Sequence, residues 1–505
     1  MSRASMLAKI QANIIGEKLQ NIDQELTIEY HTSTTSADRD IRMNISTSDS
    51  VGLFTKDISS TIINREFDIA VHSWKDLPVD LPKKTQIIGT VKRGDIRDIL
   101  IFKSQTALCN NKNTIQILSS SPRRRHNLKL SLSKLVPFNF NHLSFLDIRG
   151  NIETRLKKFK NGNSDGIVIA KVAIDRILES NDYKSKDFIN EILQNNKWLI
   201  LPLSVFPTAP GQAAIAVEAR TDRSDLKKII SKINDRDIFD DVMKEKKILS
   251  KYGGGCQQKI GVSIYSKRGQ KILSMKGQTE GGDNINKYEF VKSPLEKKFR
   301  KVPKKLLYPL KNDKNLFNRS KILKSDKISK LENSFIFLSR KNVLDNVFSI
   351  NSNNFIWTSG LKCWQYASSM GYWVNGTSDS LGNTDTQEIK NLLPDKISLY
   401  NLSHKKAFLS NYELISTYEL KINDEIVKNL KIQDKRYFYW MSPAQFDIIY
   451  EHYPDVLNAN HSCGFGKTYD YLKTKLPKPD KINCFLSYDH WLSYYKKEKK
   501  DESKI

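Results

Sequence analysis

The sequence predicts an α/β protein built from several domains. Short apolar runs alternate with segments of helical apolar spacing over the first 295 residues. The chain has 505 residues, more than one ordinary domain holds, and its 39% hydrophobic content is sufficient for packed cores. We therefore expect mostly parallel sheets, with ligands bound at the carboxyl ends of the strands.

The individual elements follow from local patterns. Apolar residues recur every three or four positions in LAKIQANIIGEKLQ and FTKDISSTIIN, which predicts helices. Strands are expected in LTIEYHT, DIAVHS and AAIAVEAR, and SDGIVIAKVAIDRIL reads as a strand that passes into a helix. We interpret the Lys-rich residues 296–332 as a basic linker. Residues 333–490 form a second α/β module, with strands in FIFLSR, FIWTSG, RYFYWMS and INCFLSY, and 491–505 are expected to be a disordered tail.

Composition excludes several classes of protein. No apolar run reaches the roughly 18 residues of a transmembrane helix, and the start has no secretory h-region. The five cysteines are scattered without a CxxC pair, which argues against a zinc site or a disulfide framework. We expect a monomeric cytoplasmic protein with no metal and no membrane partner.

The net charge of +26 allows nucleic acid, a membrane surface or acidic small molecules as partners. Lys, Asn and Ile are frequent throughout, so a general compositional bias explains much of the charge equally well. No nucleic-acid motif with interleaved aromatic residues is present, and we expect no nucleic-acid partner. Only locally clustered arginines carry a functional argument.

Four motifs carry that argument. In DIAVHSWKDLP a strand delivers Ser73, Lys75 and Asp76 to its carboxyl end, where Asp76 could act as an acid; a solvated turn is the alternative. In SSSPRRR, Ser121 is a good N-cap before Pro122, which predicts the start of a helix. Hydroxyls, free backbone N–H groups and two guanidinium groups would gather there and could bind an anion. The alternative is a solvated basic helix start. The residues of this second motif are Ser119, Ser121, Arg123 and Arg124.

The third motif, IRGNIETR, places Arg149 after a strand and Arg155 in the next helix, so that both could face one cleft. Arg176, in AIDRIL, is a weaker candidate. The fourth motif, YGGGCQ, puts Cys256 on an open glycine loop, where nearby arginines would favour the thiolate. A buried structural cysteine is the ordinary alternative.

Together and in this order, DIAVHSWKDLP, SSSPRRRHNL, IRGNIETRL, APGQAAIAVEAR and GGGCQQKIG resemble the landmark segments of the porphobilinogen deaminase (hydroxymethylbilane synthase) family over residues 1–295. The resemblance implies two lobes like those of periplasmic binding proteins, over 1–93 with 196–220 and over 94–195. A small α+β domain over 221–295 would carry the cofactor cysteine, and the α/β module would follow it.

The resemblance also implies a reaction. Four porphobilinogen molecules would condense stepwise, each losing ammonia, onto a dipyrromethane cofactor joined to Cys256, and the linear tetrapyrrole would be released by hydrolysis. Asp76 and Lys75 would be catalytic. The cofactor-binding residues would be Lys75, Ser119, Ser121, Arg123, Arg124, Arg155 and Cys256. Porphobilinogen and the polypyrrole intermediates would contact Arg3, Ser5, Phe54, Ser73, Arg149, Arg155 and Arg176.

Some positions depart from the family pattern. The chain begins almost inside the family's first motif, without the strand usual before it, so we expect either a start placed too late or an altered edge of the first domain. Asp49–Gly52 stands where a lysine-bearing loop is usual, and Ser36 to Asp38 where Arg-Gly-Asp is common. Ala213 replaces a glycine, and Pro122 replaces an apolar residue. These changes predict a divergent enzyme. The alternative is a non-catalytic two-lobed binding protein for acidic small molecules, which would have no use for Cys256.

The C-terminal module more weakly resembles uroporphyrinogen-III synthase, through YWMSPA and CGFGKT, with WTSG and GYWVNG as further turns. Backbone N–H groups at such turns could bind carboxylates, although ordinary strand-to-helix turns look the same. The resemblance implies a possible second activity, the closure of the tetrapyrrole.

Overall fold

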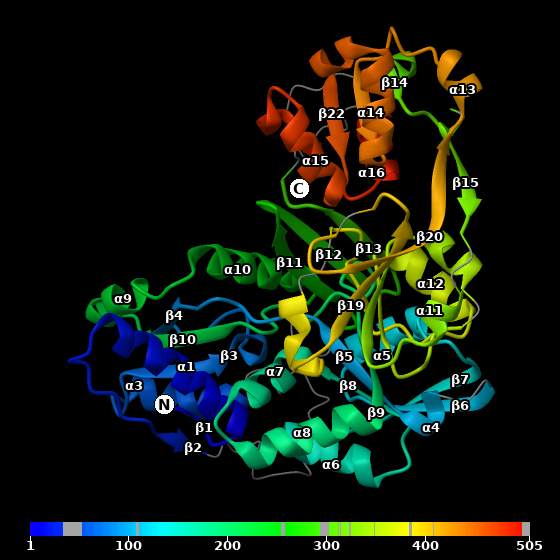
Figure 1. The fold of residues 1–505 in the computed structure, drawn as a ribbon. Coiled ribbons are helices and arrows are strands. Elements are labelled where there is room, and N and C mark those ends of the chain that lie inside the picture. Colours follow the sequence, from blue (N-terminus) through cyan, green and yellow to red (C-terminus); the bar gives the residue numbers. More distant parts are fainter. Residues whose placement is uncertain are drawn as a thin grey trace. The chain divides into compact units, whose positions relative to one another are not determined.

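In a computed structural model the chain divides into two compact units (Figure 1). The structure describes residues 1–33, 53–107, 111–253, 258–292, 302–311, 313, 315–322, 325–347, 349–382, 386–407 and 409–496. The N-terminal unit comprises Met1–Tyr265, Leu273–Tyr288 and Ile389–Leu393. The C-terminal unit comprises Ser266–Ile272, Glu289–Glu388 and Pro394–Ile505. None of the helices in the described part of the chain has the length and apolarity needed to cross a membrane.

The first 290 residues alternate strands and helices, as predicted. The strands are β1 (Ser2–Arg3), β2 (Thr32–Ser33), β3 (Ile69–Ser73), β4 (Thr85–Gly89), β5 (Asp98–Lys103), β6 (Asn111–Leu118), β7 (Asn139–Leu146), β8 (Gly166–Ala170), β9 (Asn196–Ile200), β10 (Ile215–Arg220), β11 (Gly261–Lys267), β12 (Gln270–Gln278) and β13 (Asn284–Phe290). The α-helices are α1 (Met6–Ile22), α3 (Leu53–Ile63), α4 (Ser104–Ala107), α5 (Pro122–Ser131), α6 (Ile152–Asn161), α7 (Lys171–Glu179), α8 (Tyr183–Asn195), α9 (Ser224–Ser231) and α10 (Arg236–Ser250). Single 3-10 turns are η2 (Trp74–Asp76) and η3 (Leu132–Lys134).

The sheets of this part are mixed, so the prediction of mostly parallel sheets is wrong for it. The order of the five-stranded sheet is β7-β6-β8-β5-β9, and that of a three-stranded sheet is β3-β10-β4. Strand β6 runs parallel to β7 and β8, whereas β5 and β10 run antiparallel to both of their neighbours. No helix separates β4 from β5 or β9 from β10. Both of these connections pass from one sheet to the other, so neither of them forms a parallel βαβ unit.

Helix α1 covers the core formed by strands β3 and β10. Its apolar stripe, which includes Ile15 and Leu19, packs on Val71 of β3 and Val217 of β10. The predicted strand LTIEYHT is wrong except for Thr32, because residues 26–31 cross α1 as irregular chain. Leu26 and Ile28 pack on the same core. The Tyr30 hydroxyl occupies the space that a side chain at Gly16 would need, so this glycine permits the crossing.

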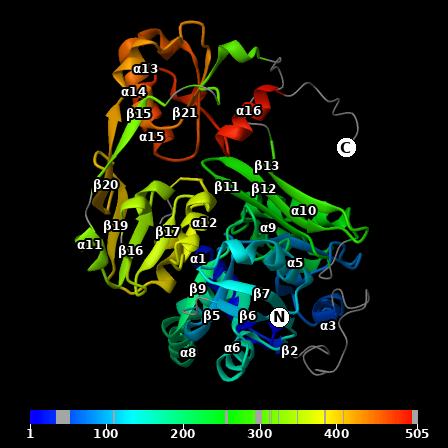
Figure 2. The ribbon, with the colours of Figure 1, turned by 90° about the vertical axis from the view of Figure 1, so that its right-hand side faces the viewer.

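Strands β11, β12 and β13 form a separate three-stranded sheet, and α10 belongs to the same region (Figure 2). A buried ion pair ties this region to the rest of the unit. Arg93 donates two hydrogen bonds to Glu245 of α10, both 2.9 Å long, and Glu245 also accepts from the N–H groups of Gly211 and Ile264. One carboxylate thus fixes three segments that are far apart in the sequence.

The C-terminal unit contains two further sheets. The strands are β14 (Leu307–Tyr308), β15 (Phe317–Lys321), β16 (Ser334–Leu338), β17 (Phe355–Thr358), β18 (Gly376–Thr377), β19 (Ser398–His404), β20 (Glu413–Ile422), β21 (Tyr437–Trp440), β22 (Asn460–Cys463) and β23 (Asn483–Cys484). The helices are α11 (Ser325–Ser329), α12 (Leu361–Ser369), α13 (Asp424–Lys428), α14 (Pro443–His452), α15 (Lys467–Lys475) and α16 (Tyr488–Lys496), with 3-10 turns η4 (Lys304–Leu306), η5 (Lys341–Asn346), η6 (Thr386–Leu392), η7 (Pro454–Asn458) and η8 (Pro479–Lys481).

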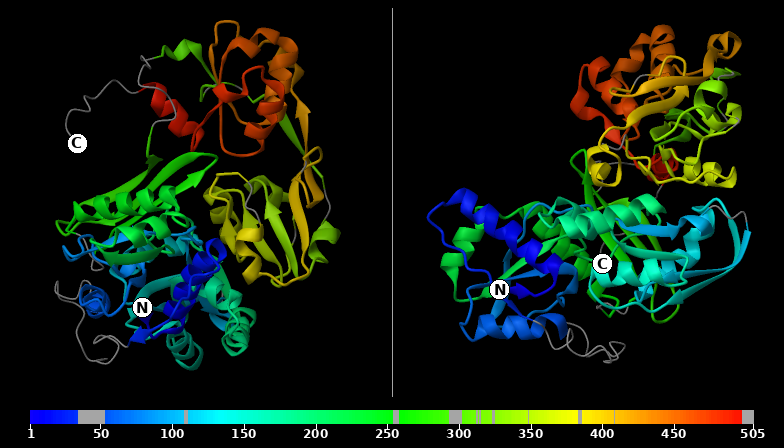
Figure 3. Two further views of the ribbon diagram at one scale, coloured as in Figure 1. Left: turned by 90° about the vertical axis from the view of Figure 1, so that its left-hand side faces the viewer. Right: turned by 60° about the horizontal axis from the view of Figure 1, so that its bottom comes forward.

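Both of these sheets are parallel apart from one strand. Their orders are β14-β21-β22-β23 and β15-β20-β19-β16-β17-β18, in which β15 alone runs antiparallel to its neighbour. The antiparallel pair β15–β20 extends along one side of the unit (Figures 2 and 3). The four strands predicted for this module are all present, although the last comprises only Asn483 and Cys484.

Two predicted boundaries need correction. Residues 296–332 are not a linker throughout, because β14 pairs with β21 and β15 pairs with β20. Leu307 and Tyr308 are buried there, so the lysines of this segment alternate with residues that complete a core. The predicted disordered tail begins too early, because α16 extends to Lys496 and its Trp491 and Leu492 are buried among aromatic side chains. Residues 497–505 lie outside the described part.

Candidate functional site

The polar turn that follows β3 is fixed by contacts between its backbone and two other segments of the chain. Trp74 is buried, and its N–H donates to the carbonyl of Ala214 over 3.0 Å. The Lys246 ammonium of α10 donates to the carbonyl of Leu77 over 2.7 Å. A side chain at Gly211 would meet the backbone of Trp74 and Lys75 at 3.3 and 3.2 Å. The turn that presents Lys75 and Asp76 is therefore fixed by the 211–214 turn and by α10.

The side chains of Lys75 and Asp76 are half-buried, and neither forms a hydrogen bond or ion pair with any residue that the structure describes. Burial lowers the pKa of Lys75; Arg124 and Arg155 lower it as well, while Asp76 and Asp98 act in the opposite direction. Burial also lowers the pKa of Arg155, and Arg124 and Arg3 add to that effect, whereas Asp76 opposes it. The predicted residues Arg3, Lys75, Asp76, Arg124 and Arg155 therefore form one electrostatic cluster.

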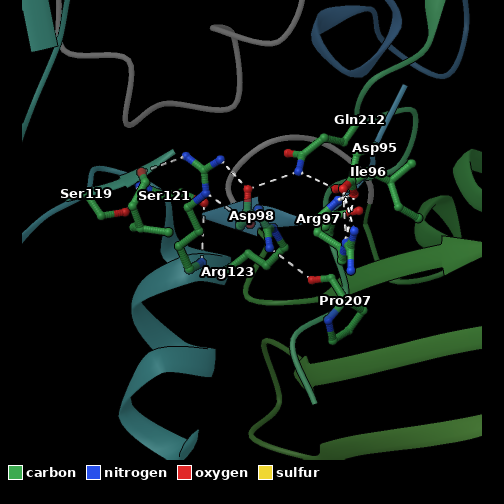
Figure 4. A network of polar contacts seen from close by, with 12 residues as sticks. Asp95, Ile96, Arg97, Asp98, Ser119, Ser121, Arg123, Pro207 and Gln212 are labelled. Atoms are coloured by element: carbon green, nitrogen blue, oxygen red, sulfur yellow. Dashed lines mark hydrogen bonds and ion pairs between the residues drawn. The ribbon is translucent and has the colours of Figure 1, made fainter. Parts of the chain in front are cut away.

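Arg123 and Arg124 begin α5, as predicted, and the anion that they hold is a carboxylate of the chain itself. Arg124 donates to Asp98 over 2.6 and 3.3 Å, and Arg123 donates to the same carboxylate over 2.9 Å (Figure 4). Gln212 donates a fourth bond over 3.0 Å. The Asp98 side chain is fully buried, and the two guanidinium groups hold its pKa well below the usual range against the effect of burial.

The two arginines differ in what else they contact. Arg123 donates to the carbonyl of Pro207 and lies over the ring of Phe206, which commits its guanidinium to the interior. Arg124 is also bonded to the carbonyl of Val168, yet it is close enough to Lys75 and Arg155 to affect their titration. Of the two, Arg124 is therefore the one that borders the cluster. We retain the predicted cofactor contact of Arg123 only as a proposal.

The serines of the second motif shape the start of α5. The Ser121 hydroxyl accepts from the N–H of Arg124 over 3.4 Å, which confirms the predicted N-cap before Pro122. The buried Ser119 hydroxyl in turn accepts from the N–H of Ser121. Both hydroxyls thus organise the backbone that presents the two arginines.

The third motif also adopts the predicted turn. Gly150 has a φ of +108°, which favours glycine, and Asn151 caps α6. The Arg155 side chain folds back and donates to the carbonyl of Gly150 over 2.7 Å. Arg149 is half-buried beside the same turn. Arg176 is buried and donates to the carbonyl of Ala213 over 2.9 Å, and burial lowers its pKa to about 10.

The remaining predicted residues fall into two groups. Arg3 and Ser5 are half-buried before α1, and the Ser73 hydroxyl exchanges hydrogen bonds with the Gln11 amide. The Phe54 side chain, Cys256, the 49–52 loop and the 36–38 segment lie outside the described residues. Gly253, just before the cysteine loop, has a φ of +95°, and α10 leads directly to it.

Three residues that organise this region were not predicted as site residues. Asp98 and Gln212 hold the arginines, and Glu245 holds the Gly211 turn. The sequence held one indication of the role of Asp98: a charged residue there begins a strand whose next four residues are apolar. Ala213 has a φ of +69°, which explains physically why a glycine suits this position.

Replacing Asp98 with Asn should destabilise the fold, because two buried guanidinium groups lose their anion. We expect the free energy of unfolding to fall by about 3–5 kcal/mol at neutral pH, measured in urea. The folded pKa of Asp98 is depressed, so its contribution is present at neutral pH and is lost as the pH falls below about 4. The difference between wild type and variant should therefore narrow in acid.

The exposed carboxylate of Asp147, which pairs with Arg125, supplies a matched control. The Asp147→Asn variant should lose less than about 1 kcal/mol. Equal losses in the two variants would contradict the role assigned to Asp98.

Comparison with known proteins identifies the family. A family model described as porphobilinogen deaminase, dipyromethane cofactor binding domain, matches residues 1–228, which confirms the expected cofactor. The porphobilinogen deaminase of Syntrophomonas wolfei is 34% identical over 287 residues, covering 57% of this chain and 86% of that protein. The porphobilinogen deaminase of Nostoc sp. is 31% identical over 290 residues, covering 57% and 83%. With its ordered motifs and its cluster around Asp76, the chain belongs to the porphobilinogen deaminase family.

Proposed function

We propose that this chain is a hydroxymethylbilane synthase, which condenses porphobilinogen molecules with loss of ammonia and releases a linear tetrapyrrole. One observation carries the proposal: Lys75 and Asp76 are half-buried and unpaired among the described residues, inside a group of arginines. Each pyrrole unit brings an acetate and a propionate, so a growing chain needs several cations. Guanidinium groups suit this task because they hold carboxylates in a forked geometry.

The residues present fit a dipyrromethane joined to Cys256. Positive charge from Arg3, Lys75, Arg124 and Arg155 is gathered around the Asp76 carboxylate, and neither Lys75 nor Asp76 has a hydrogen-bond or ion-pair partner among the described residues. When bound, the cofactor would supply the free pyrrole carbon for the first condensation, and the terminal pyrrole of the growing chain would supply it for each later one. We assign its carboxylates to Lys75, Arg124 and Arg155, with Ser119 and Ser121 holding the backbone around them.

Asp76 is the acid and the electrostatic partner in this proposal. Its carboxyl group can pass a proton to the departing amine and then stabilise the positive charge that develops on the pyrrole ring. The turn that carries it cannot move freely, because the carbonyls of Leu77 and Ala214 are bonded across it. Partial exclusion of water around Asp76 strengthens both effects. Burial lowers the pKa of Lys75 and Arg155, and neighbouring arginines lower it further; substrate carboxylates would neutralise the charge of these arginines.

We also infer a cytoplasmic location. The five cysteines are scattered along the sequence without a CxxC pair or the spacing of a disulfide framework, which suits a reducing compartment.

The test of the catalytic proposal is Asp76→Asn. We expect the variant to fold and to keep its cofactor, while porphobilinogen consumption falls by about a hundredfold or more, because the acid and the charge partner are both lost. The exposed Asp80→Asn, four residues along the chain, serves as the control and should consume porphobilinogen at nearly the wild-type rate. An Asp76→Asn variant as active as the control would refute the assigned role.

For the C-terminal unit we propose the activity of a uroporphyrinogen-III synthase, which closes the linear tetrapyrrole. The supporting observation is a basic site at the carboxyl ends of its parallel strands, where ligands of such sheets bind. Arg340 follows β16 and reaches the carbonyl of Met441 after β21, and His404 ends β19. Burial lowers the pKa of His404, and the nearby Arg340 and Lys467 lower it further. Ser442 caps α14 in the same region.

Product analysis tests this second activity. Porphobilinogen is supplied to the full chain, the products are oxidised, and the uroporphyrin isomers are separated. We expect the type III isomer from wild type, and an Arg340→Gln, Lys467→Gln double variant should shift the product toward type I because the carboxylate site loses two cations. Type I alone from the wild-type chain would exclude the synthase while leaving the deaminase proposal intact.

A further inference from the structure

A second basic cluster lies in the N-terminal unit, apart from the Asp76 site. It consists of His126 and Lys129 on α5, Lys134 in η3, Lys259 before β11 and Lys276 on β12. In Figures 1 and 2, α5 lies beside the sheet of β11, β12 and β13. We refer to these five residues as the α5–β12 basic cluster. The proposed reaction assigns no role to any of them.

The members approach one another from three segments of the chain. Burial lowers the pKa of His126, and Lys259, Lys129 and Lys276 lower it further in that order. Burial also lowers the pKa of Lys276, with Lys134 adding to the effect. Alternate residues of a strand share a face, so Lys276 lies on the same face of β12 as Gln278, whose amide oxygen accepts from the Lys259 ammonium over 3.2 Å.

None of the five side chains is paired with a carboxylate in the part of the chain that the structure describes. The one polar partner found for the cluster is the neutral Gln278 amide. Glu280, the acidic residue nearest in sequence on this side, accepts from Gln258 instead. Like charges brought together without counter-charges repel one another, and the repulsion is largest where water is partly excluded.

Two details distinguish this cluster from an ordinary solvated surface. The Nε2 atom of His126 is buried and has no hydrogen-bond partner among the described residues. A buried polar atom normally has a partner, which water, an ion or a ligand can supply. Lys276 is half-buried, whereas Lys129, Lys134 and Lys259 are exposed.

We propose that the α5–β12 basic cluster binds a multivalent anion, a small molecule that carries several carboxylate or phosphate groups. Lys276 and Lys259 supply the inner positive charges, next to His126 of α5. Lys129 and Lys134 complete the outer side. Lys259 follows Cys256 by three residues in the sequence. The two possible sources are oligopyrrole carboxylates and a phosphate-bearing metabolite.

Direct binding to the purified full chain with its cofactor tests the proposal. Calorimetric titrations with mellitate, a benzene polycarboxylate, and with inorganic pyrophosphate are made at constant ionic strength set with chloride. We expect at least one of them to bind wild type, and a Lys259→Gln, Lys276→Gln double variant to bind it about tenfold more weakly, which corresponds to about 1.4 kcal/mol. Binding of mellitate alone indicates a carboxylate ligand, and binding of pyrophosphate alone indicates a phosphate ligand.

A Lys227→Gln, Lys228→Gln double variant on α9 makes the same change in charge at exposed positions and should bind like wild type. Acetylation of wild type provides a second measurement that does not depend on how a variant folds. The anion should protect Lys259 and Lys276 from the reagent and leave Lys227 and Lys228 unprotected. Absence of binding by both anions, or equal binding by the two double variants, would overturn the proposal.

Discussion

The buried carboxylate of Asp98 is the contact on which the N-terminal unit depends. It joins the start of β5 to the first turn of α5 through two arginines, and to the 211–214 turn through Gln212. That turn leads to the next contact, because the N–H of Gly211 is bonded to Glu245 of α10. Removal of a charge from such a network leaves its partners buried and uncompensated, which is far more costly than the loss of a surface pair.

This network explains how a short 3-10 turn can present two charged side chains with little freedom. Lys75 and Asp76 belong to η2, which by itself would adapt to solvent. The surrounding contacts to Leu77, Trp74 and Gly211 come from segments that Glu245 and Asp98 hold in place. Binding and catalytic groups are most effective when they are ordered before the ligand arrives, because no reorganisation is then needed during the reaction.

Some of the arginines stabilise the fold, and others are available to bind a ligand. Arg123 is committed to Asp98 and Pro207, whereas the one hydrogen bond of the Arg155 side chain within the described part of the chain goes to its own turn. Arg124 belongs to both groups. Of the anion site predicted from SSSPRRR, the structure shows only the protein's own Asp98 carboxylate bound to the two arginines, so ligand binding there stays a prediction. Charge repulsion among Arg3, Arg124 and Arg155 remains, and substrate carboxylates would relieve it.

Local patterns predicted much of this fold because the signals were local. The Ser121 cap, the Gly150 turn and the strands that end at Ser73 and Ala170 all follow from neighbouring residues. The errors arose where distant segments decide the outcome. Segment 26–31 has a strand pattern but packs across α1. Strands β14 and β15 lie in a lysine-rich stretch that would look like a linker without their partners β21 and β20.

The same limit applies to the site. The motifs identified Asp76, Lys75 and the arginines, since each occupies a recognisable turn or helix start. Asp98, Gln212 and Glu245 could not be assigned from sequence, because a buried charge is recognised only by the partners that surround it. The contact of Arg123 with Asp98 is a relation between α5 and β5, 25 residues apart, that no single motif contains.

The intact mass of the purified chain tests the central claim, that Cys256 carries the cofactor of a working deaminase, most directly. The mass should exceed that of the bare chain by two pyrrole units, and Ehrlich's reagent should give a pyrrole colour. A Cys256→Ser variant should have the bare mass and no colour, while a Cys463→Ser variant should keep both signals. A wild-type chain with the bare mass and no colour would contradict the account.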